Sequence, residues 1–346
     1  MHDVQSIISQ SPPVDVTKPY DADNLKGKVM LITGGANGLG AHMVRKWASH
    51  GAHIFIGDID DAAGEAFVAQ LRAEHEGQTF HYLRCNVVEW EDQVALFDAA
   101  VRLSPTKAID IVVPNAGVLI AADAWGFEHP TLDEKSGRLN PPNTRILDVN
   151  ITGVVYTTHL ALYHLPRNTA PGSDRAILLI GSVASFMPLP GQAFYAMSKH
   201  AVMGLFRSLR ATAFPHGVRV NMLAPYYVAQ TNMLRPALEA VLMSGTAGAA
   251  KVEDVIDAAT RLVADTSVSG RSLAVGPRLK TSPEGLAPIE AHEGDGEGRA
   301  VWECYTYDYD QVESFRWRYI QILNAVEASR GYLAWLKDII GIYWRK

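Results

Sequence analysis

Short apolar runs rich in β-branched residues alternate with longer helical patterns between Lys28 and about Val275. This alternation is typical of β-α-β units, in which parallel strands are buried beneath helices on both faces. The right-handed crossover rule and the short connections leave few other topologies. We therefore predict an α/β fold with a doubly wound sheet of seven parallel strands. The predicted strands are Val29–Thr33, His53–Ile56, Phe80–Arg84, Ile109–Val113, Ala176–Ile180, Val218–Leu223 and Ser272–Val275.

The composition is that of an ordinary globular protein. Of 346 residues, 48% are hydrophobic and 20% are charged, unlike a disordered, collagen-like or coiled-coil chain. Lys and Arg number 31 against 37 Asp and Glu, and this net charge of −6 disfavours nucleic acid as a partner. The two cysteines match no disulfide or zinc pattern, which favours a reducing, cytoplasmic location. We expect no signal peptide, no transmembrane helix and no metal site.

Three segments lie outside the alternation. Residues 1–25 show no periodicity, and we predict an N-terminal arm that is loose or held on the surface. Residues 118–143 contain three prolines and are predicted to form an extended connection near the carboxyl ends of the strands. The composition changes after Gly276, so we predict a catalytic domain over residues 26–276. Residues 277–346 are predicted to form an acidic linker and an aromatic-rich helical tail.

Apolar residues recur in the tail at the spacing of two amphipathic helices. Three roles are open for these helices: packing onto the same chain or across a dimer, forming a lid over the substrate pocket, or lying on a membrane surface. The last role would suit the four Trp residues and the basic end of the tail. The repeating residues are Phe315, Tyr319, Ile322 and Val326, followed by Leu333, Leu336, Ile340 and Tyr343.

A glycine-rich loop, Thr33-Gly-Gly-Ala-Asn-Gly-Leu-Gly40, follows the first predicted strand and precedes a helical segment. Glycines let the backbone approach a pyrophosphate closely, and the free N–H groups of the following helix attract its negative charge. The position of the loop therefore predicts a bound dinucleotide. The residues assigned to the cofactor here are Gly34, Asn37, Gly38, Leu39 and Gly40.

Asp58 ends the second predicted strand, eighteen positions after Gly40. This is close to the ~20-residue interval at which an acidic side chain accepts hydrogen bonds from the adenosine ribose. A carboxylate there repels the 2′-phosphate of NADP, so Asp58 predicts NAD as the cofactor. Arg45 and Lys46 on the preceding helix remain candidates to offset this charge. In the alternative interpretation Asp58 or Asp60 caps the next helix, or the two residues divide the roles.

Tyr195 and Lys199 stand four positions apart, and therefore on one face of a helix if this segment is helical. A nearby ammonium in a partly desolvated site lowers the pKa of a phenol, which lets the phenol act as a base. Ser182 ends the fifth predicted strand, where it can donate to a substrate oxygen that gains negative charge. These side chains predict a catalytic centre at the carboxyl ends of the strands.

Over residues 26–276 the chain resembles the short-chain dehydrogenase/reductase superfamily, whose fold is Rossmann-like. Six motifs occur in the order and approximate spacing of that family, which makes the resemblance specific, and the tail is not covered by it. The motifs are T-G-x-x-x-G-x-G at Thr33–Gly40, the acid Asp58, N-A-G at Asn115–Gly117, Asn150, Ser182 and Y-x-x-x-K at Tyr195–Lys199.

The resemblance implies a role for each catalytic residue. It implies that Tyr195 is the acid/base and that Lys199 lowers the pKa of Tyr195 and binds the nicotinamide ribose. It implies that Ser182 holds the substrate oxygen and that Asn150 positions a water for proton relay. The further residues that it assigns to the cofactor are Asn86, Val87, Asn115, Ala116, Gly117, Pro225 and Val228.

Two departures from the family pattern affect the cofactor site. Asn86 stands where the family usually has Asp, but an amide oxygen can still accept from the adenine amino group. Tyr226 follows Pro225 where the family has Gly, and the expected Thr is displaced. Gln230 and Thr231 therefore both remain candidates for contact with the nicotinamide carboxamide.

Apolar residues surround the predicted catalytic centre, which predicts a hydrophobic substrate such as a steroid, lipid, terpenoid or polyketide. With NAD as cofactor, we expect a secondary alcohol to be oxidised to a ketone by a homodimeric enzyme. The alternatives are an NADPH-dependent ketone reductase, a non-redox isomerase or cyclase, and a non-catalytic dinucleotide-binding scaffold. The predicted substrate-pocket residues are Val183, Met187, Gln192, Tyr226 and Tyr227.

Overall fold

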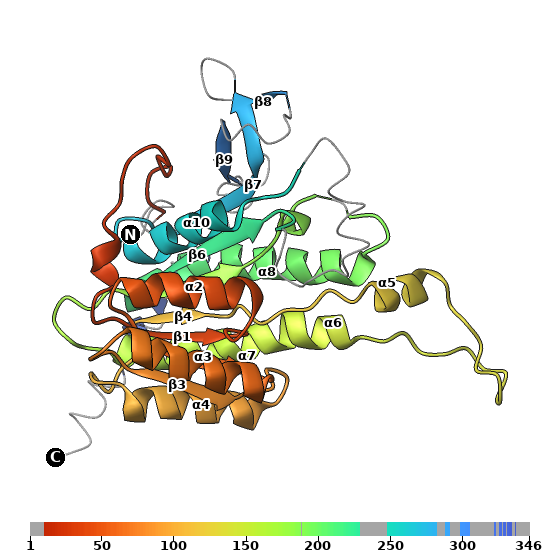
Figure 1. Ribbon diagram of the computed structural model, residues 1–346, viewed down its shortest axis with the longest axis horizontal. Coiled ribbons are helices and arrows are strands. Elements are labelled where there is room, and N and C mark those ends of the chain that lie inside the picture. Colours follow the sequence, from red (N-terminus) through yellow and green to blue (C-terminus); the bar gives the residue numbers. More distant parts are fainter. Residues whose placement is uncertain are drawn as a thin grey trace.

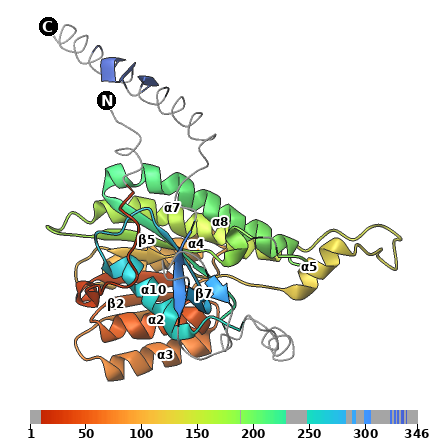
Figure 2. The ribbon, with the colours of Figure 1, turned by 90° about the horizontal axis from the view of Figure 1, so that it is seen from above.

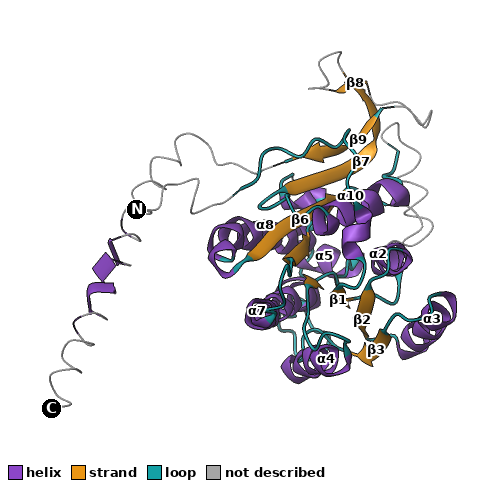
Figure 3. Ribbon diagram, turned by 90° about the vertical axis from the view of Figure 1, so that its left-hand side faces the viewer, coloured by secondary structure: helices purple, strands orange, loops and turns teal. Residues whose placement is uncertain are grey.

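The computed structural model describes most of the chain. A central sheet lies between two layers of helices, with α2, α3 and α10 on one face and α4, α7 and α8 on the other (Figure 1, Figure 3). The predicted doubly wound α/β fold is thereby confirmed. The described residues are 10–187, 189–228, 248–281, 288–290 and 298–304, with helical positions 322, 325, 326, 328, 329, 331–333 and 336.

The sheet has the strand order β3-β2-β1-β4-β5-β6-β7-β8, with β9 paired to β7. The first seven strands are parallel, as predicted, and the last two join β7 in antiparallel register. Strand order reverses between β1 and β4, the point at which doubly wound sheets bind ligands. The strands are β1 Val29–Thr33, β2 His53–Asp58, β3 Phe80–Arg84, β4 Ile111–Val113, β5 Arg175–Ile180, β6 Val218–Pro225, β7 Ser272–Thr281, β8 Pro288–Glu290 and β9 Arg299–Glu303.

Each face of the sheet is covered by its own apolar cluster. Every residue of β1 and β6 is buried, because helices cover both sides of these strands. Trp47 and Leu262 belong to the cluster on one face, and Phe97 and Phe206 to the cluster on the other. The helices are α2 Gly38–Ser49, α3 Asp61–Glu74, α4 Trp90–Leu103, α5 Ala121–Glu128, α6 Arg145–Leu147, α7 Val154–His164, α8 Ala193–Thr212 and α10 Val252–Ala264.

The predicted boundary after Gly276 falls inside β7, which continues to Thr281. β9, from the region predicted as a linker and tail, pairs with β7 so that Val275 stands opposite Val301. Without this pairing, β7 would present a row of unsatisfied backbone groups at the edge of the sheet. Residues 299–303 therefore belong to the same sheet as the strands before Gly276.

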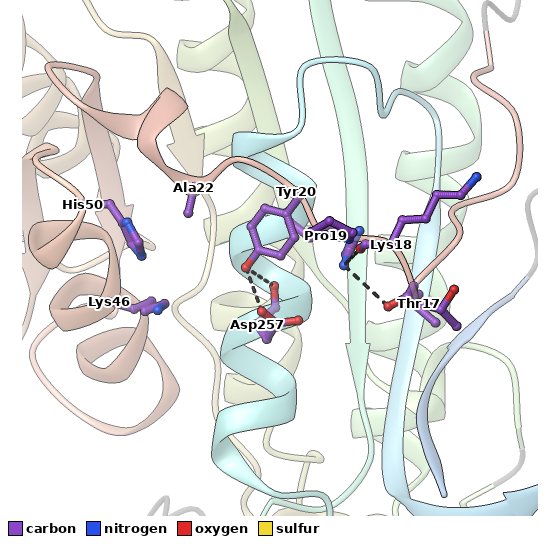
Figure 4. A pocket seen from close by; sticks show the side chains of 10 residues that line it. Thr17, Lys18, Pro19, Tyr20, Ala22, Lys46, His50 and Asp257 are labelled. Carbon is purple, nitrogen blue, oxygen red and sulfur yellow. Dashed lines mark hydrogen bonds between the residues drawn. The ribbon is translucent and has the colours of Figure 1, made fainter.

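Over its described residues the N-terminal arm lies on the surface, first against Ser269 and Glu303 and then against α10. The Tyr20 hydroxyl donates to Asp257 Oδ1 at 2.8 Å, and the Arg261 guanidinium stands 4.5 Å from the centre of the Tyr20 ring. These contacts border a cavity of about 480 Å³, with Lys46 and His50 on its far side (Figure 4). Burial and Asp257 together raise the pKa of Tyr20, so the phenol stays neutral and holds the arm in place.

Residues 119–144, which we call the protruding arm, extend beyond the first turn of α8 in two perpendicular views (Figure 1, Figure 2). The arm begins with α5, and a single antiparallel bridge joins Leu132 to Leu139. The ring of Phe127 lies 4.6 Å from that of Phe194 at the start of α8. The arm is thus attached to the body beside the first turn of α8.

No helix among the described residues is both long enough and apolar enough to cross a membrane. Of the two patterns predicted in the tail, Ile322, Val326, Leu333 and Leu336 occupy helical positions. The remaining members of both patterns lie outside the described residues, as do Gln230 and Thr231.

Candidate active site

The glycine-rich loop packs so tightly that side chains are excluded from it. Gly34 has φ of +65°, and a Cβ atom there would stand 2.7 Å from the Cα of Ala116. A Cβ on Gly40 would stand 2.1 Å from the carbonyl oxygen of Gly34. Asn37 precedes α2 without capping it, so its side chain leaves the first N–H groups of that helix available to an anion. These are properties that a pyrophosphate site requires.

The N-A-G segment holds this loop in place. The Asn115 amide donates to the carbonyl oxygens of Thr33 at 3.0 Å and Gly34 at 2.7 Å. In return, the Thr33 hydroxyl accepts from the backbone N–H groups of Asn115 at 3.2 Å and Ala116 at 3.3 Å. The loop and the end of β4 therefore form one hydrogen-bonded unit.

Of the two acids considered as the cap of α3, Asp60 caps the helix and Asp58 does not. Asp60 caps α3 by accepting from the N–H of Ala63 at 3.0 Å. Asp58 does not cap the helix. Its Oδ2 accepts from the N–H of Ala36 in the glycine-rich loop at 3.0 Å, and its Oδ1 accepts from Ile59 at 2.7 Å. The carboxylate is thus fixed beside the loop, where the adenosine ribose is expected.

The two basic residues considered from the sequence are directed elsewhere, but a third lies next to Asp58. Arg45 stands over the ring of Phe67, and Lys46 borders the cavity under the N-terminal arm. Arg84, which the sequence reasoning missed, is the partner of Asp58 in the β2–β3 register. The sequence contained a signal for this contact, because β2 and β3 both end in a charged residue and parallel pairing places the ends of neighbouring strands side by side.

Asn86 and Val87, which the family resemblance assigns to the adenine, follow the end of β3. Val87 is buried, and a Cβ on Gly153 would stand 2.7 Å from its Cγ2 atom. The backbone N–H of Asn86 donates to Asp92 Oδ2 at 2.9 Å. Asp92 therefore places a carboxylate beside the position where the family usually has Asp.

Tyr195 and Lys199 lie on one turn of α8, and both are buried. Lys199 Nζ stands 5.7 Å from the centre of the Tyr195 ring and donates to the carbonyl oxygen of Ile180 at 3.0 Å. Ser182 follows β5, and its hydroxyl oxygen lies 3.3 Å from the carbonyl oxygen of Pro225. Strand ends and one helix thus bring the three predicted side chains to the same edge of the sheet.

Two opposing influences act on the pKa of the Tyr195 phenol. Burial raises the pKa of the Tyr195 phenol, while a hydrogen bond with Ser182 lowers it. The Lys199 ammonium is held near the phenol by its hydrogen bond to the Ile180 carbonyl oxygen. Burial also lowers the pKa of Lys199 to about 8. The hydrogen bond with Ser182 thus partly offsets the effect of burial on the pKa of the phenol.

Asn150 lies in a π-helical turn, Asp148–Gly153, and its amide is fully used. Its Oδ1 accepts from the N–H of Val118 at 2.8 Å, and its Nδ2 donates to the Val118 carbonyl at 2.9 Å and to Ser198 Oγ at 3.1 Å. Ser198 Oγ in turn donates to the Tyr195 carbonyl at 2.8 Å. Asn150 therefore connects the start of the protruding arm to α8, and Ser198 is a participant that sequence reasoning missed.

The predicted substrate-pocket residues lie after β5, after β6 and at the start of α8. Met187 is exposed, whereas Val183 is half-buried. Tyr226 is half-buried against the apolar cluster of one face, and the Tyr227 carbonyl accepts from the N–H of Ala250 at 2.9 Å. Gln192 precedes α8, and its Oε1 is buried with no hydrogen-bond partner among the described residues.

Comparison with known proteins agrees with this geometry. A family model described as short chain dehydrogenase matches residues 28–241. A 5'-hydroxyaverantin dehydrogenase from Dothistroma septosporum is 36% identical over 290 residues, covering 80% of this chain and 91% of the relative. A second 5'-hydroxyaverantin dehydrogenase, from Emericella nidulans, is 35% identical over 301 residues, covering 83% and 93%.

A solved structure shares the fold. The 3-ketoacyl-(acyl-carrier-protein) reductase from Brucella melitensis, complexed with NADH, aligns with a TM-score of 0.59 and 27% identity. The alignment covers 72% of this chain and 97% of the reductase. The chain belongs to the short-chain dehydrogenase/reductase family and is an oxidoreductase of the alcohol dehydrogenase type.

Proposed function

We propose that this protein is an NAD-dependent dehydrogenase that oxidises a secondary alcohol on a hydrophobic molecule to a ketone. One observation supports the proposal most. The buried side chains of Tyr195, Lys199 and Ser182 lie together at the edge of the sheet where the glycine-rich loop also lies. The relatives are named as dehydrogenases of a hydroxylated compound, which agrees with this direction.

The residues present fit a nicotinamide dinucleotide. The tightly packed glycine-rich loop, in which Gly34 and Gly40 leave no room for a Cβ atom, and the uncapped start of α2 suit the pyrophosphate. Asp58 suits the adenosine ribose. Lys199, adjoining Gly117, would hold the nicotinamide ribose. When bound, the nicotinamide supplies a hydride acceptor.

The chain's own residues perform the proton chemistry. Ser182 holds the substrate oxygen by hydrogen bonding. Tyr195, deprotonated to the phenolate beside the Lys199 ammonium, takes the hydroxyl proton as the carbinol carbon loses hydride. Burial excludes water from Tyr195 and strengthens each of these interactions. Val183, Met187, Gln192, Tyr226 and Tyr227 are proposed to contact the remainder of the substrate.

The choice of NAD is tested by titrating the protein with NADH and NADPH and following nicotinamide fluorescence. We expect tighter binding of NADH, and in Asp58→Ala a loss of roughly tenfold or more of this preference. Glu65→Ala, an exposed acid on α3, is the matched control and should leave the preference unchanged. Tighter binding of NADPH by the wild type would contradict NAD as cofactor, and binding of neither would contradict a nicotinamide-dependent enzyme.

A second candidate, an NADPH-dependent ketone reductase, is favoured by the position of Arg84 beside Asp58. Arg84 donates to Asp61 Oδ2 at 2.8 Å and to the carbonyl oxygen of Ile59 at 2.9 Å, so it would have to leave these partners to meet a 2′-phosphate. If the protein is an NADPH-dependent reductase, Arg84→Ala should weaken NADPH binding and leave NADH binding unchanged.

We further propose a homodimer formed through α7 and α8. Three large apolar side chains on these helices are exposed on the single chain, namely Val155, Tyr163 and Met197. Analytical ultracentrifugation tests the proposal, with Tyr163→Glu expected to shift the protein toward the monomer.

Both cysteines are free, which supports the proposed location in a reducing cytoplasm.

A further inference from the structure

A second cavity, of about 360 Å³, lies in the base of the protruding arm. It is bounded by α5 on one side and by the proline-rich return segment of the arm on the other. Most of its walls are apolar, and proline and phenylalanine rings give them flat surfaces. The lining residues that matter here are Asp123, Phe127, Pro130, Leu139, Pro141 and Pro142.

Asp123 is the acidic residue of this lining, and one of its oxygens lacks a partner. Its Oδ1 accepts from the Asn143 amide at 3.0 Å, while its Oδ2 is buried with no hydrogen-bond donor among the described residues. A buried carboxylate oxygen without a donor destabilises the protein, because it has lost its hydrogen bonds to water and formed none to replace them. A donor group on a ligand in the cavity would remove this destabilisation.

The cavity adjoins the catalytic centre through two elements. α5 packs against α8, and Phe127 of the cavity wall contacts Phe194, the residue before Tyr195. The arm itself begins just after Val118, which is bonded to Asn150. Gln192, three positions before Tyr195, adds a second buried oxygen without a donor. The wall of the cavity therefore contacts the start of α8 one residue before Tyr195.

We propose that the cavity in the protruding arm binds an aromatic ring of the substrate whose hydroxyl group donates a hydrogen bond to Asp123 Oδ2. This inference rests on the proposed function and names its substrate class: hydroxylated aromatic compounds that carry a secondary alcohol. A neutral hydroxyl suits the site better than an ammonium, because the walls are apolar and the amide of Asn143 already donates to the same carboxylate.

The test uses four naphthyl secondary alcohols that differ at the far ring, which bears a phenolic hydroxyl, a methoxy group, a hydrogen or an amino group. Isothermal titration calorimetry measures the affinity of each for the full chain saturated with the reduced cofactor, NADH, or NADPH if that is the cofactor bound, so that no alcohol is oxidised during the titration. We expect the phenol to bind roughly 10- to 100-fold more tightly than the methoxy and unsubstituted compounds. Asp123→Asn should reduce this preference to roughly threefold or less.

Glu128→Gln is the matched control, because Glu128 ends the same helix, is exposed and does not line the cavity. This variant should keep the wild-type preference. Thermal unfolding followed by circular dichroism checks that Asp123→Asn folds. Equal affinities for all four compounds, failure of all four to bind, a preference for the amine, or a preference that survives Asp123→Asn would each overturn the inference.

Measuring the oxidation of the same four alcohols distinguishes a failure of this inference from a failure of the proposed function. Oxidation of the unsubstituted alcohol without any preference for the phenol would leave the dehydrogenase intact and contradict the role of Asp123. A phenol preference that depends on Asp123, with no oxidation of any of the four alcohols, would support the binding site and count against the dehydrogenase.

Discussion

Asn150 in the catalytic centre is 1% exposed and bonds with both atoms of its amide, whereas Trp125 in the protruding arm is 66% exposed and stacks only on its neighbour His129. The same contrast extends to the glycines. Gly34 has no room for a Cβ atom, but Gly126 has nothing within 4 Å of one. The residues proposed for cofactor binding and proton transfer are thus held rigidly by the core. The cavity proposed to select the substrate lies in the protruding arm, whose residues can change at little cost in stability.

The largest effect is expected at the reacting group. Tyr195→Phe removes the proton acceptor but keeps the buried ring, so kcat should fall roughly 10²- to 10⁴-fold with little change in cofactor affinity. Steady-state kinetics on an identified alcohol measures this fall. Tyr163→Phe, on the exposed face of α7, is the control and should retain wild-type kcat. Retention of full activity by Tyr195→Phe would remove Tyr195 from the mechanism.

The two glycines offer a direct test of the contrast between the regions. Gly34→Ala should lower the free energy of unfolding by about 2–4 kcal/mol and weaken cofactor binding, because it combines a positive φ with a backbone clash. Gly126→Ala should raise the free energy of unfolding by up to about 1 kcal/mol, because Gly126 lies inside α5 and has open space for a Cβ atom. Urea denaturation measures both changes. A similar loss in both variants would show that the arm is as tightly constrained as the core.

A pH effect is expected from the buried ammonium of Lys199. Its pKa is about 8 in the folded chain and about 10.5 when unfolded, so the unfolded state binds more protons between these values. The free energy of unfolding of the wild type should therefore rise, relative to Lys199→Met, by up to about 3 kcal/mol as the pH increases from 8 to 10.5. Parallel denaturation curves at several pH values provide the measurement. Identical pH dependence in the two proteins would show that Lys199 is not desolvated.

The smallest effect is expected on the exposed surface of the protruding arm. Trp125→Ala removes a stacking contact with His129 whose ring centres are 3.7 Å apart. Because the indole is largely in water, the free energy of unfolding should change by less than about 1 kcal/mol. Differential scanning calorimetry tests this expectation. A larger loss would mean that the arm contributes to the stability of the whole chain.

Much of the fold and the catalytic centre could be predicted from the sequence because the signals are local. The apolar runs of β1 and β6 match strands that are buried on both faces, and the glycines of Thr33–Gly40 coincide with positions where a Cβ has no room. The spacing of Tyr195 and Lys199 needed only the helical period. Such features depend on neighbouring residues and therefore do not require knowledge of how distant segments meet.

Other features depended on which segments meet in space, and only the tertiary structure decided them. The pairing of β9 with β7 brings residues 299–303 into the sheet, and the β2–β3 register places Arg84 beside Asp58. The fold also directs Lys199 to Ile180 and leaves Asp123 Oδ2 without a donor. The sequence alone thus determined the seven parallel strands and the position of the glycine-rich loop, and it predicted the catalytic side chains that we propose. Strand register, side-chain direction and the pairing of buried polar atoms required the structure, because each depends on contacts between residues far apart in the chain.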